Sequence, residues 1–165
     1  MRSYWIALSI CLLIVGLPNH GQQENASRTP TEPSTPEEIK QFNAEQLSVL
    51  ERQITGKENQ PSEAVFKNIK ILTGIPAGNL LKIMQMGFSQ SLGTSCAHCH
   101  VIGQWEKDDK PNKQIARDMW NMDRAVVSDY LKKIEGLKDR NPIVNCTTCH
   151  RGQLKPALNL DAPKN

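Results

Sequence analysis

The sequence is short of aromatic residues, of net charge and of long apolar runs. Aromatic residues make up 5% of its 165 residues, so something other than aromatic rings has to fill part of the core. The net charge is only +3, because 20 basic residues nearly balance 17 acidic ones, and nucleic acid is therefore not an expected partner. The length suits one globular domain, and the composition argues against an integral membrane protein.

The one apolar run lies at the N-terminus. It extends from Tyr4 to Leu17, about 14 residues against the roughly 20 that a membrane-spanning helix needs. Arg2 precedes it and polar residues follow, which is typical of a secretory signal peptide over residues 1–21, with an uncleaved anchor as the alternative. Cys11 lies inside the run and follows Ile10, whereas a lipid-attachment cysteine would follow a small residue near the end of the run. We therefore expect export to the periplasm, where the other cysteines meet an oxidising compartment.

The segment after this leader is polar and rich in proline. Residues 22–38 contain three prolines among Ser, Thr, Glu and Gln, with almost no apolar residue. Such a composition cannot bury enough apolar surface to order itself, so it predicts a disordered linker. Residues 39–165 then form the expected folded domain.

Three helices are expected in the remaining chain, and no segment alternates as a strand would. The first emerges from the end of the linker, with Thr35 as its cap, and ends before Gly56. The others extend over residues 76–92 and 113–134, each with apolar residues at helical spacing. The sequence therefore predicts an all-α fold with long loops.

Four of the five cysteines form two copies of the pattern C-x-x-C-H, at residues 96–100 and 146–150. This is the attachment pattern of a c-type haem, because two thiols at this spacing bond the two former vinyl groups of one porphyrin. The adjacent histidine then lies under the ring, where its imidazole binds the iron. The predicted haem-binding residues are Cys96, Cys99, His100, Cys146, Cys149 and His150, with the two histidines as iron ligands.

Three other uses of two C-x-x-C pairs explain less of the pattern. A Cys₄ zinc site needs no histidine, and the 46 residues between the pairs exceed the roughly 15–20 of a compact zinc module. Structural disulfides leave both histidines unexplained, and a thioredoxin-like redox pair needs a β-α-β context that is absent here. Two haems would also supply the apolar bulk that the scarce aromatic residues cannot.

Each iron has a sixth position, for which histidine is scarce. His98 lies within the first attachment loop and cannot reach its own haem; the other haem, a propionate contact and the surface are its alternatives. Methionine is the other usual ligand, and four candidates lie in the two helices that precede the motifs. Met84 and Met86 face different sides of a helix, so one of them is expected at the first haem. Met119 or Met122 is expected at the second.

The motifs taken together resemble the cytochrome c subunit of photosynthetic reaction centres and its short exported relatives. The resemblance extends over about residues 65–157 and rests on several segments beside the two C-x-x-C-H motifs. These are the stretch from Met84 to Thr94, Trp105-x-x-Asp108-Asp109-Lys110-Pro111, Ala116-Arg117-x-Met119-x-x-Met122, and Arg151-Gly152 after the second motif.

The resemblance implies a small multihaem domain in which a helix–loop–haem unit is used twice. It implies a methionine on the preceding helix as the sixth ligand of each haem, and it assigns Met119 to the second. For the first haem the family register falls on Gln85, and we prefer the neighbouring Met84, with Met86 as the alternate. The photosynthetic subunit is similar to two such pairs of motifs, with four haems in all, whereas this chain has one pair. The resemblance therefore does not imply that this chain reduces a photo-oxidised chlorophyll pair directly.

The expected function is electron transfer by a diheme c-type cytochrome, and not an enzymatic reaction. Expected partners are redox proteins or a membrane electron-transfer complex, together with the haem-maturation machinery. A diheme peroxidase is the enzymatic alternative; a haem-based sensor or the haem subunit of a larger membrane complex is the other. The basic residues Lys110, Lys113, Arg117, Lys132 and Lys133 are expected mostly on a solvated helix face, with haem propionates or an acidic partner as the alternative.

Overall fold

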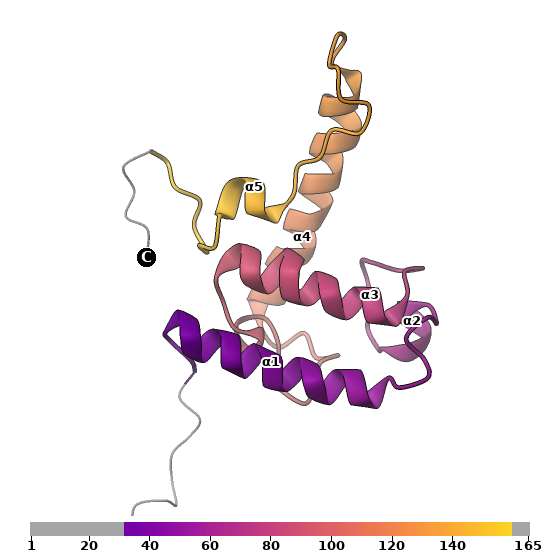
Figure 1. Ribbon diagram of the computed structural model, residues 1–165, viewed down its shortest axis with the longest axis vertical. Helices are drawn as coiled ribbons and strands as arrows, with labels where there is room; N and C mark the ends of the chain where they lie inside the picture. The colour runs from indigo at the N-terminus through magenta and orange to yellow at the C-terminus, as the bar shows by residue number, and fades with distance from the viewer. Residues whose placement is uncertain (1–31, 160–165) are drawn as a thin grey trace, which may run out of the picture. The chain divides into compact units, whose positions relative to one another are not determined.

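The computed structural model describes residues 32–159, and within them it is helical (Figure 1). This part of the chain contains no β-strand and only two isolated bridges, so the all-α prediction is confirmed. None of its helices combines the length and apolar character needed to cross a membrane. The predicted signal peptide and residues 22–31 of the predicted linker lie outside the described residues.

Helix α1, Pro36–Gln53, begins at a reciprocal cap. The Thr35 hydroxyl accepts a hydrogen bond from the Glu38 amide at 3.2 Å, and the Glu38 carboxylate accepts one from the Thr35 amide at 3.1 Å. Pro36 fixes the first turn, as the sequence predicts. The helix therefore includes the last three residues of the predicted linker.

The second predicted helix is continuous but changes its hydrogen-bonding pattern. It begins as α3, Ala77–Lys82, and continues as the π-helix η1, Ile83–Gln90. Gly93, with φ of +62°, follows its end. The π-helical stretch was not predicted; it contains Met84, and such stretches often occur at functional sites.

The third predicted helix also changes its hydrogen-bonding pattern along its length, and it has three parts. They are α4, Pro111–Ala125, the π-helix η3, Val126–Tyr130, and a final 3₁₀ turn, Leu131–Lys133. The predicted range of 113–134 is right to within two residues at each end. Three shorter helices complete the helices of the described region: α2 at Ser62–Val65, the 3₁₀ helix η2 at Cys96–His98, and α5 at Cys146–His150.

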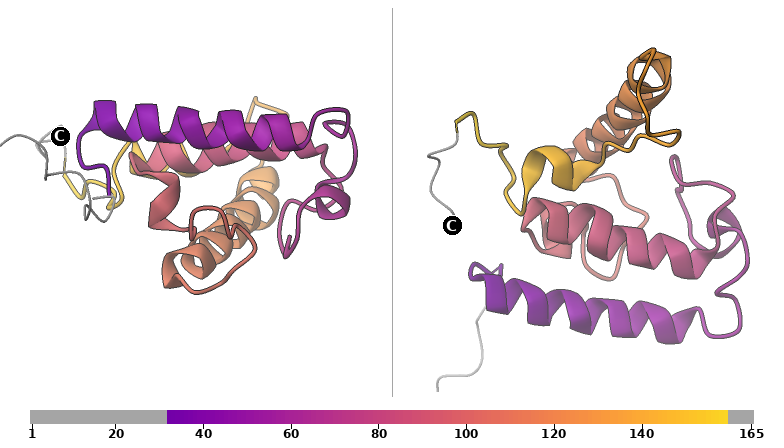
Figure 2. Two further views of the ribbon diagram at one scale, coloured as in Figure 1. Left: turned by 90° about the horizontal axis from the view of Figure 1, so that it is seen from below. Right: turned by 45° about the horizontal axis from the view of Figure 1, so that its top comes forward.

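The buried apolar core belongs to the first part of the chain. Helices α1 and α3 pack side by side, as Figure 2 shows, and α2 also packs against α3. The buried core residues are Leu47, Leu50, Ile54, Ala77 and Leu81, with Val65, Phe66 and Trp105 packed against them. The Trp105 loop thereby connects this core to the first C-x-x-C-H motif.

The later part of the chain has no such core. After Arg117, no residue up to 159 is buried. Large apolar side chains are instead exposed there and on α4: Ile115, Met119, Met122, Tyr130, Ile134, Leu137, Ile143, Leu154 and Leu158. The amphipathic helix over residues 111–133 thus has an exposed apolar face.

Candidate haem-binding sites

The first C-x-x-C-H motif lines a cavity of about 410 Å³. This volume lies in the range of small-molecule and cofactor sites. Helices α1, α3, η1 and α4 and the Trp105 loop contribute its walls. The motif residues Cys96, Cys99 and His100 share these walls with the apolar side chains of Leu47, Leu50, Leu80, Leu81, Met84 and Phe88.

The backbone of the first motif forms a single tight turn. The His100 amide donates to the Cys96 carbonyl at 3.0 Å, which brings both thiols and the ring together. Neither thiol is in a disulfide, and both are half-buried. Burial raises the pKa of both thiols, that of Cys99 to about 11, so they are protonated at neutral pH. Both thiols line the cavity, so each lies next to the space that a porphyrin would fill.

The ring of His100 is held in one tautomer. Its Nδ1 lies 3.3 Å from the Trp105 carbonyl oxygen. A carbonyl can only accept, so Nδ1 carries the proton and Nε2 keeps its lone pair. The pKa of His100 is lowered to about 4, mainly by burial and to a smaller extent by the Lys113 charge. The imidazole is therefore neutral. A neutral imidazole with Nε2 free has the state required of a metal ligand.

The second motif repeats this arrangement on a short helix, α5. Asn145 caps it: its side chain accepts from the Thr148 amide at 3.2 Å, and its amide donates to the Thr148 hydroxyl at 3.1 Å. The helix ends at Arg151 in a left-handed conformation. Nδ1 of His150 lies 2.9 Å from the Gln153 carbonyl oxygen, so Nε2 is again left for a metal.

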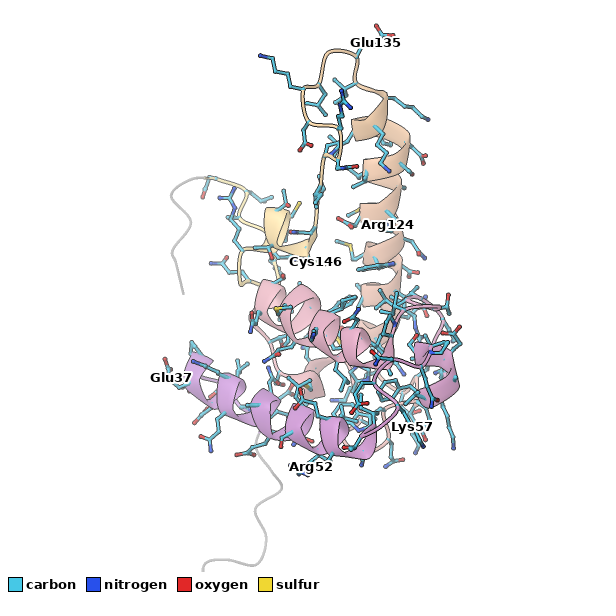
Figure 3. All side chains as sticks on the ribbon, turned by 45° about the vertical axis from the view of Figure 1, so that its right-hand side comes forward. Glu37, Arg52, Lys57, Arg124, Glu135 and Cys146 are labelled. Carbon is cyan, nitrogen blue, oxygen red and sulfur yellow. The ribbon has the colours of Figure 1, made fainter. Side chains whose placement is uncertain are left out.

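The second motif lies beside α4, as Figures 1 and 3 show for α5 and for the labelled Cys146. Cys146 is half-buried; this partial loss of solvent raises the pKa of its thiol, and the Asp123 charge on α4 raises it further. Cys149 is unpaired and exposed. The donor set of each motif, two thiols and one imidazole whose Nδ1 faces a carbonyl oxygen, therefore fits a c-type haem.

The four candidate methionines occupy different environments. Met84 is half-buried and lines the first cavity, whereas Met86, two residues later, is 55% exposed. On α4 the side chains of Met119 and Met122 are 37% and 50% exposed. The structure thus places one methionine of the first pair in the cavity that the thiols of the first motif also line, and leaves the other exposed.

Asn43 of α1, which the sequence did not single out, holds the chain that leads into the first motif. Its Oδ1 accepts from the Cys96 amide at 2.8 Å. Its Nδ2 donates to the Ser89 hydroxyl at 2.7 Å and to the Thr94 carbonyl at 3.2 Å. Asn43 is only 7% exposed, so these bonds are shielded from water and fix Cys96 against α1. The only sign of this role in the sequence was that Asn43 is a polar residue on the buried face of an amphipathic helix.

A second polar cluster surrounds Asp108 at the edge of the cavity. Its carboxylate binds the side chains of Lys70, Asn68, Lys113 and Arg117, and these hydrogen bonds hold its pKa well below the usual range. The expectation of a solvated face is wrong for Lys113 and Arg117, which are 8% and 6% exposed, because both reach inward to this carboxylate. Lys132 and Lys133 are exposed as expected.

The remaining histidine and the cysteine pairs do not assemble into another metal site. His98 is half-buried, and its carbonyl accepts from the Asn112 side chain at 3.2 Å. Over residues 32–159 no three His, Cys, Asp or Glu side chains are grouped as a metal ion requires. The two cysteine pairs are therefore separate in this structure and do not share a four-cysteine site.

Comparison with known proteins agrees with this donor set. The family model of the photosynthetic reaction centre cytochrome c subunit matches residues 17–160. Cytochrome c-554 of Chloroflexus aurantiacus is 30% identical over 83 residues, half of this chain and 20% of the relative. The photosynthetic reaction center cytochrome c subunit of Thermochromatium tepidum is 28% identical over 120 residues, 64% of this chain and 28% of the relative. The chain thus corresponds to less than a third of either relative. Because the model matches most of its residues, the chain belongs to the photosynthetic reaction centre cytochrome c subunit family, a family of covalent haem proteins.

Proposed function

We propose that the chain is an exported electron carrier with two covalently bound haems. The observation that carries this proposal is the repeated arrangement of thiols and ring. In both motifs two unpaired cysteines precede a histidine whose Nδ1 faces a carbonyl oxygen, Trp105 in the first and Gln153 in the second. Such a carbonyl orients an iron-bound imidazole and increases its basicity.

The residues proposed for the first haem are Cys96 and Cys99 for attachment and His100 as the proximal ligand. Met84 is the proposed sixth ligand, since its side chain lines the same cavity. The bound haem supplies a one-electron ferrous–ferric couple, and a thioether ligand raises its reduction potential. The apolar walls contributed by α1 and η1 exclude water from it.

For the second haem we propose Cys146, Cys149 and His150, with Met119 as the sixth ligand and Met122 as its alternate. The uncovered apolar face of α4 and of the chain that follows supports a second haem. Burying part of this exposed apolar surface against a porphyrin would provide the core that residues 118–159 lack. A monohaem protein would leave this surface in water.

The cellular setting belongs to the same proposal. The leader over residues 1–21 would export the chain to the periplasm, where the maturation machinery attaches haem, and the part of the predicted linker before α1, residues 22–35, would act as a tether. The partners would be redox proteins or a membrane electron-transfer complex. The family name, which refers to a photosynthetic complex, supports such a partner.

Haem stoichiometry tests the proposal. The full chain is expressed with the cytochrome c maturation machinery, and haem per chain is measured from the pyridine haemochrome spectrum and from the mass of the denatured protein. We expect two haems in the wild type and one each in the variants Cys99→Ala and Cys149→Ala. The Cys11→Ala variant, altered only in the leader, should retain both. One haem or none in the wild type would contradict the proposal.

Carbon monoxide distinguishes a carrier from a diheme peroxidase. A peroxidase needs one iron with an open or labile sixth position, whereas methionines are available here for both. We therefore expect no rapid change in the spectrum of the reduced protein when carbon monoxide is added. Rapid binding at one haem would favour the enzyme.

A further inference from the structure

The carbonyl oxygen of Trp105 accepts two hydrogen bonds. One comes from Nδ1 of His100 at 3.3 Å, and the other from Nζ of Lys113 at 2.9 Å. We propose that Lys113 is a positioning residue that raises the reduction potential of the first haem by competing for this carbonyl. The inference rests on the proposed function, because it needs a haem bound by His100.

The ammonium group of Lys113 is held in place against the Trp105 carbonyl. Its side chain is 10% exposed, and an ammonium has three N–H donors. All three have an acceptor: the Trp105 carbonyl, the Lys107 carbonyl at 2.7 Å and the Asp108 carboxylate at 3.1 Å. The cation therefore extends from the first turn of α4 and is fixed by hydrogen bonds to two carbonyls of the loop that carries Trp105.

The Trp105 loop itself is anchored. The indole ring packs against the apolar core and also lies against the ring of His100, with ring centres 5.4 Å apart. Its carbonyl therefore cannot move away from either donor without disturbing the core. The two hydrogen bonds on this oxygen compete at fixed positions.

This competition affects the iron through the histidine. A hydrogen bond from Nδ1–H to a good acceptor makes the imidazole more basic, and a more basic ligand stabilises ferric over ferrous iron. A cation on the same oxygen draws electron density away from it and makes it a weaker acceptor. The contact is 3.3 Å at His100, against 2.9 Å between His150 and the Gln153 carbonyl. The first haem should therefore be the easier one to reduce in this respect.

A buried cation also raises a haem potential through space, because it opposes the extra charge of ferric iron. Lys110 provides the matched control for this effect. Its ammonium donates to the Ala97 carbonyl, inside the first motif, and does not bond the Trp105 carbonyl. Removing the Lys110 charge should thus reproduce the through-space effect without the effect through the histidine.

The experiment compares the haem-loaded variants Lys113→Met and Lys110→Met with the wild type. The ferric-to-ferrous ratio of the first haem is measured in a redox titration, and the Nδ1 proton of His100 is measured by NMR of the reduced protein. For Lys113→Met we expect a shift of about tenfold toward ferric haem, or about 59 mV, with the Nδ1 proton moving downfield. For Lys110→Met we expect a smaller shift of the ratio and an unmoved Nδ1 proton.

The Lys113→Gln variant guards against a folding defect, because an amide keeps a donor to the carbonyl but removes the charge. It should give an intermediate shift in both measurements. An unmoved Nδ1 proton in Lys113→Met and Lys113→Gln, or shifts equal to those of Lys110→Met, would overturn the inference alone. Absence of haem at Cys96 and Cys99 in the wild type would overturn the proposed function, and this inference with it.

Discussion

Gly93 and Gly152, from the segments next to the two C-x-x-C-H motifs, are in backbone contact. A Cβ atom added at Gly93 would lie 2.0 Å from the carbonyl oxygen of Gly152. The Gly152 amide donates to the Ser91 carbonyl at 2.9 Å, and the Ser91 hydroxyl lies 2.5 Å from that of Thr147. The end of η1 is thus joined to α5 and to the turn after it.

This contact predicts that Gly93→Ala disturbs the second motif. Gly93 has φ of +62°, which costs an alanine about 1–2 kcal/mol, and the new methyl group would also push Gly152 away. Gly56→Ala is the control, because Gly56 has φ of +79° with nothing within 4 Å of an added Cβ. Thermal unfolding should show a clearly larger loss of stability for Gly93→Ala. Equal losses would mean that the two segments are not held together in solution.

Met84 and Met86 differ in solvent exposure, so the same substitution to leucine should have different effects at the two positions. Met84→Leu should abolish the sulfur-to-iron absorption band of the first haem and lower its potential, because the thioether ligand is lost. Met86→Leu should leave both unchanged, since that side chain is 55% exposed. Leucine nearly conserves the volume of methionine, so folding should be kept at a cost of less than about 1.5 kcal/mol. The opposite result would assign the ligand to Met86.

The second pair is tested in the same way on α4. Met119→Leu should lower the potential of the second haem and remove its sulfur-to-iron band, while Met122→Leu should spare both. Leucine nearly conserves the volume of methionine, so neither change should create a large cavity beside the proposed haem. A normal spectrum in Met119→Leu would contradict the proposed ligand.

The Asp108 cluster predicts an acid-sensitive fold. Its pKa is lower in the folded protein than in the unfolded chain, so its contribution is complete above the unfolded pKa of about 3.9. That contribution is lost as the pH falls toward the folded pKa. Denaturant unfolding of the wild type should therefore show stability falling below about pH 4.

Asp108→Asn should weaken this dependence and cost about 1–2 kcal/mol at neutral pH, because the buried Lys113 and Arg117 lose their anion. The cost stays below that of a fully buried pair, since the Asp108 side chain is 39% exposed. Asp109→Asn is the matched control: its side chain is 64% exposed and lies 3.9 Å from Lys107. Identical pH profiles of the two variants would show that the cluster does not act as described.

The sequence predicted those features that local chemistry determines. Thr35 and Pro36 set the start of α1, Pro76 and Gly93 bound the second helix, and apolar spacing defined the third. The family was visible because its motifs consist of neighbouring residues.

Other features depend on partners that are far apart in the chain. Asn43 bonds Ser89 and Thr94, which are 46 and 51 residues away, and Asp108 bonds Asn68, 40 residues away. No periodicity reveals such pairs. The π-helical stretches were missed for a related reason, since their apolar residues fit an ordinary helix equally well. Lys113 was predicted on a solvated helix face, because its neighbours in the sequence are polar like those of an exposed helix start, yet it is buried.

The uneven distribution of the core also bears on the biogenesis of the protein. If the chain binds haem as proposed, its first part can fold around Leu47, Leu50 and Leu81 before a porphyrin is attached. The part after Arg117, in which no residue up to 159 is buried, would wait for its cofactor. Assembly would then proceed in two stages, and the thiols of Cys146 and Cys149 would stay accessible to the attachment enzymes for longer than those of Cys96 and Cys99.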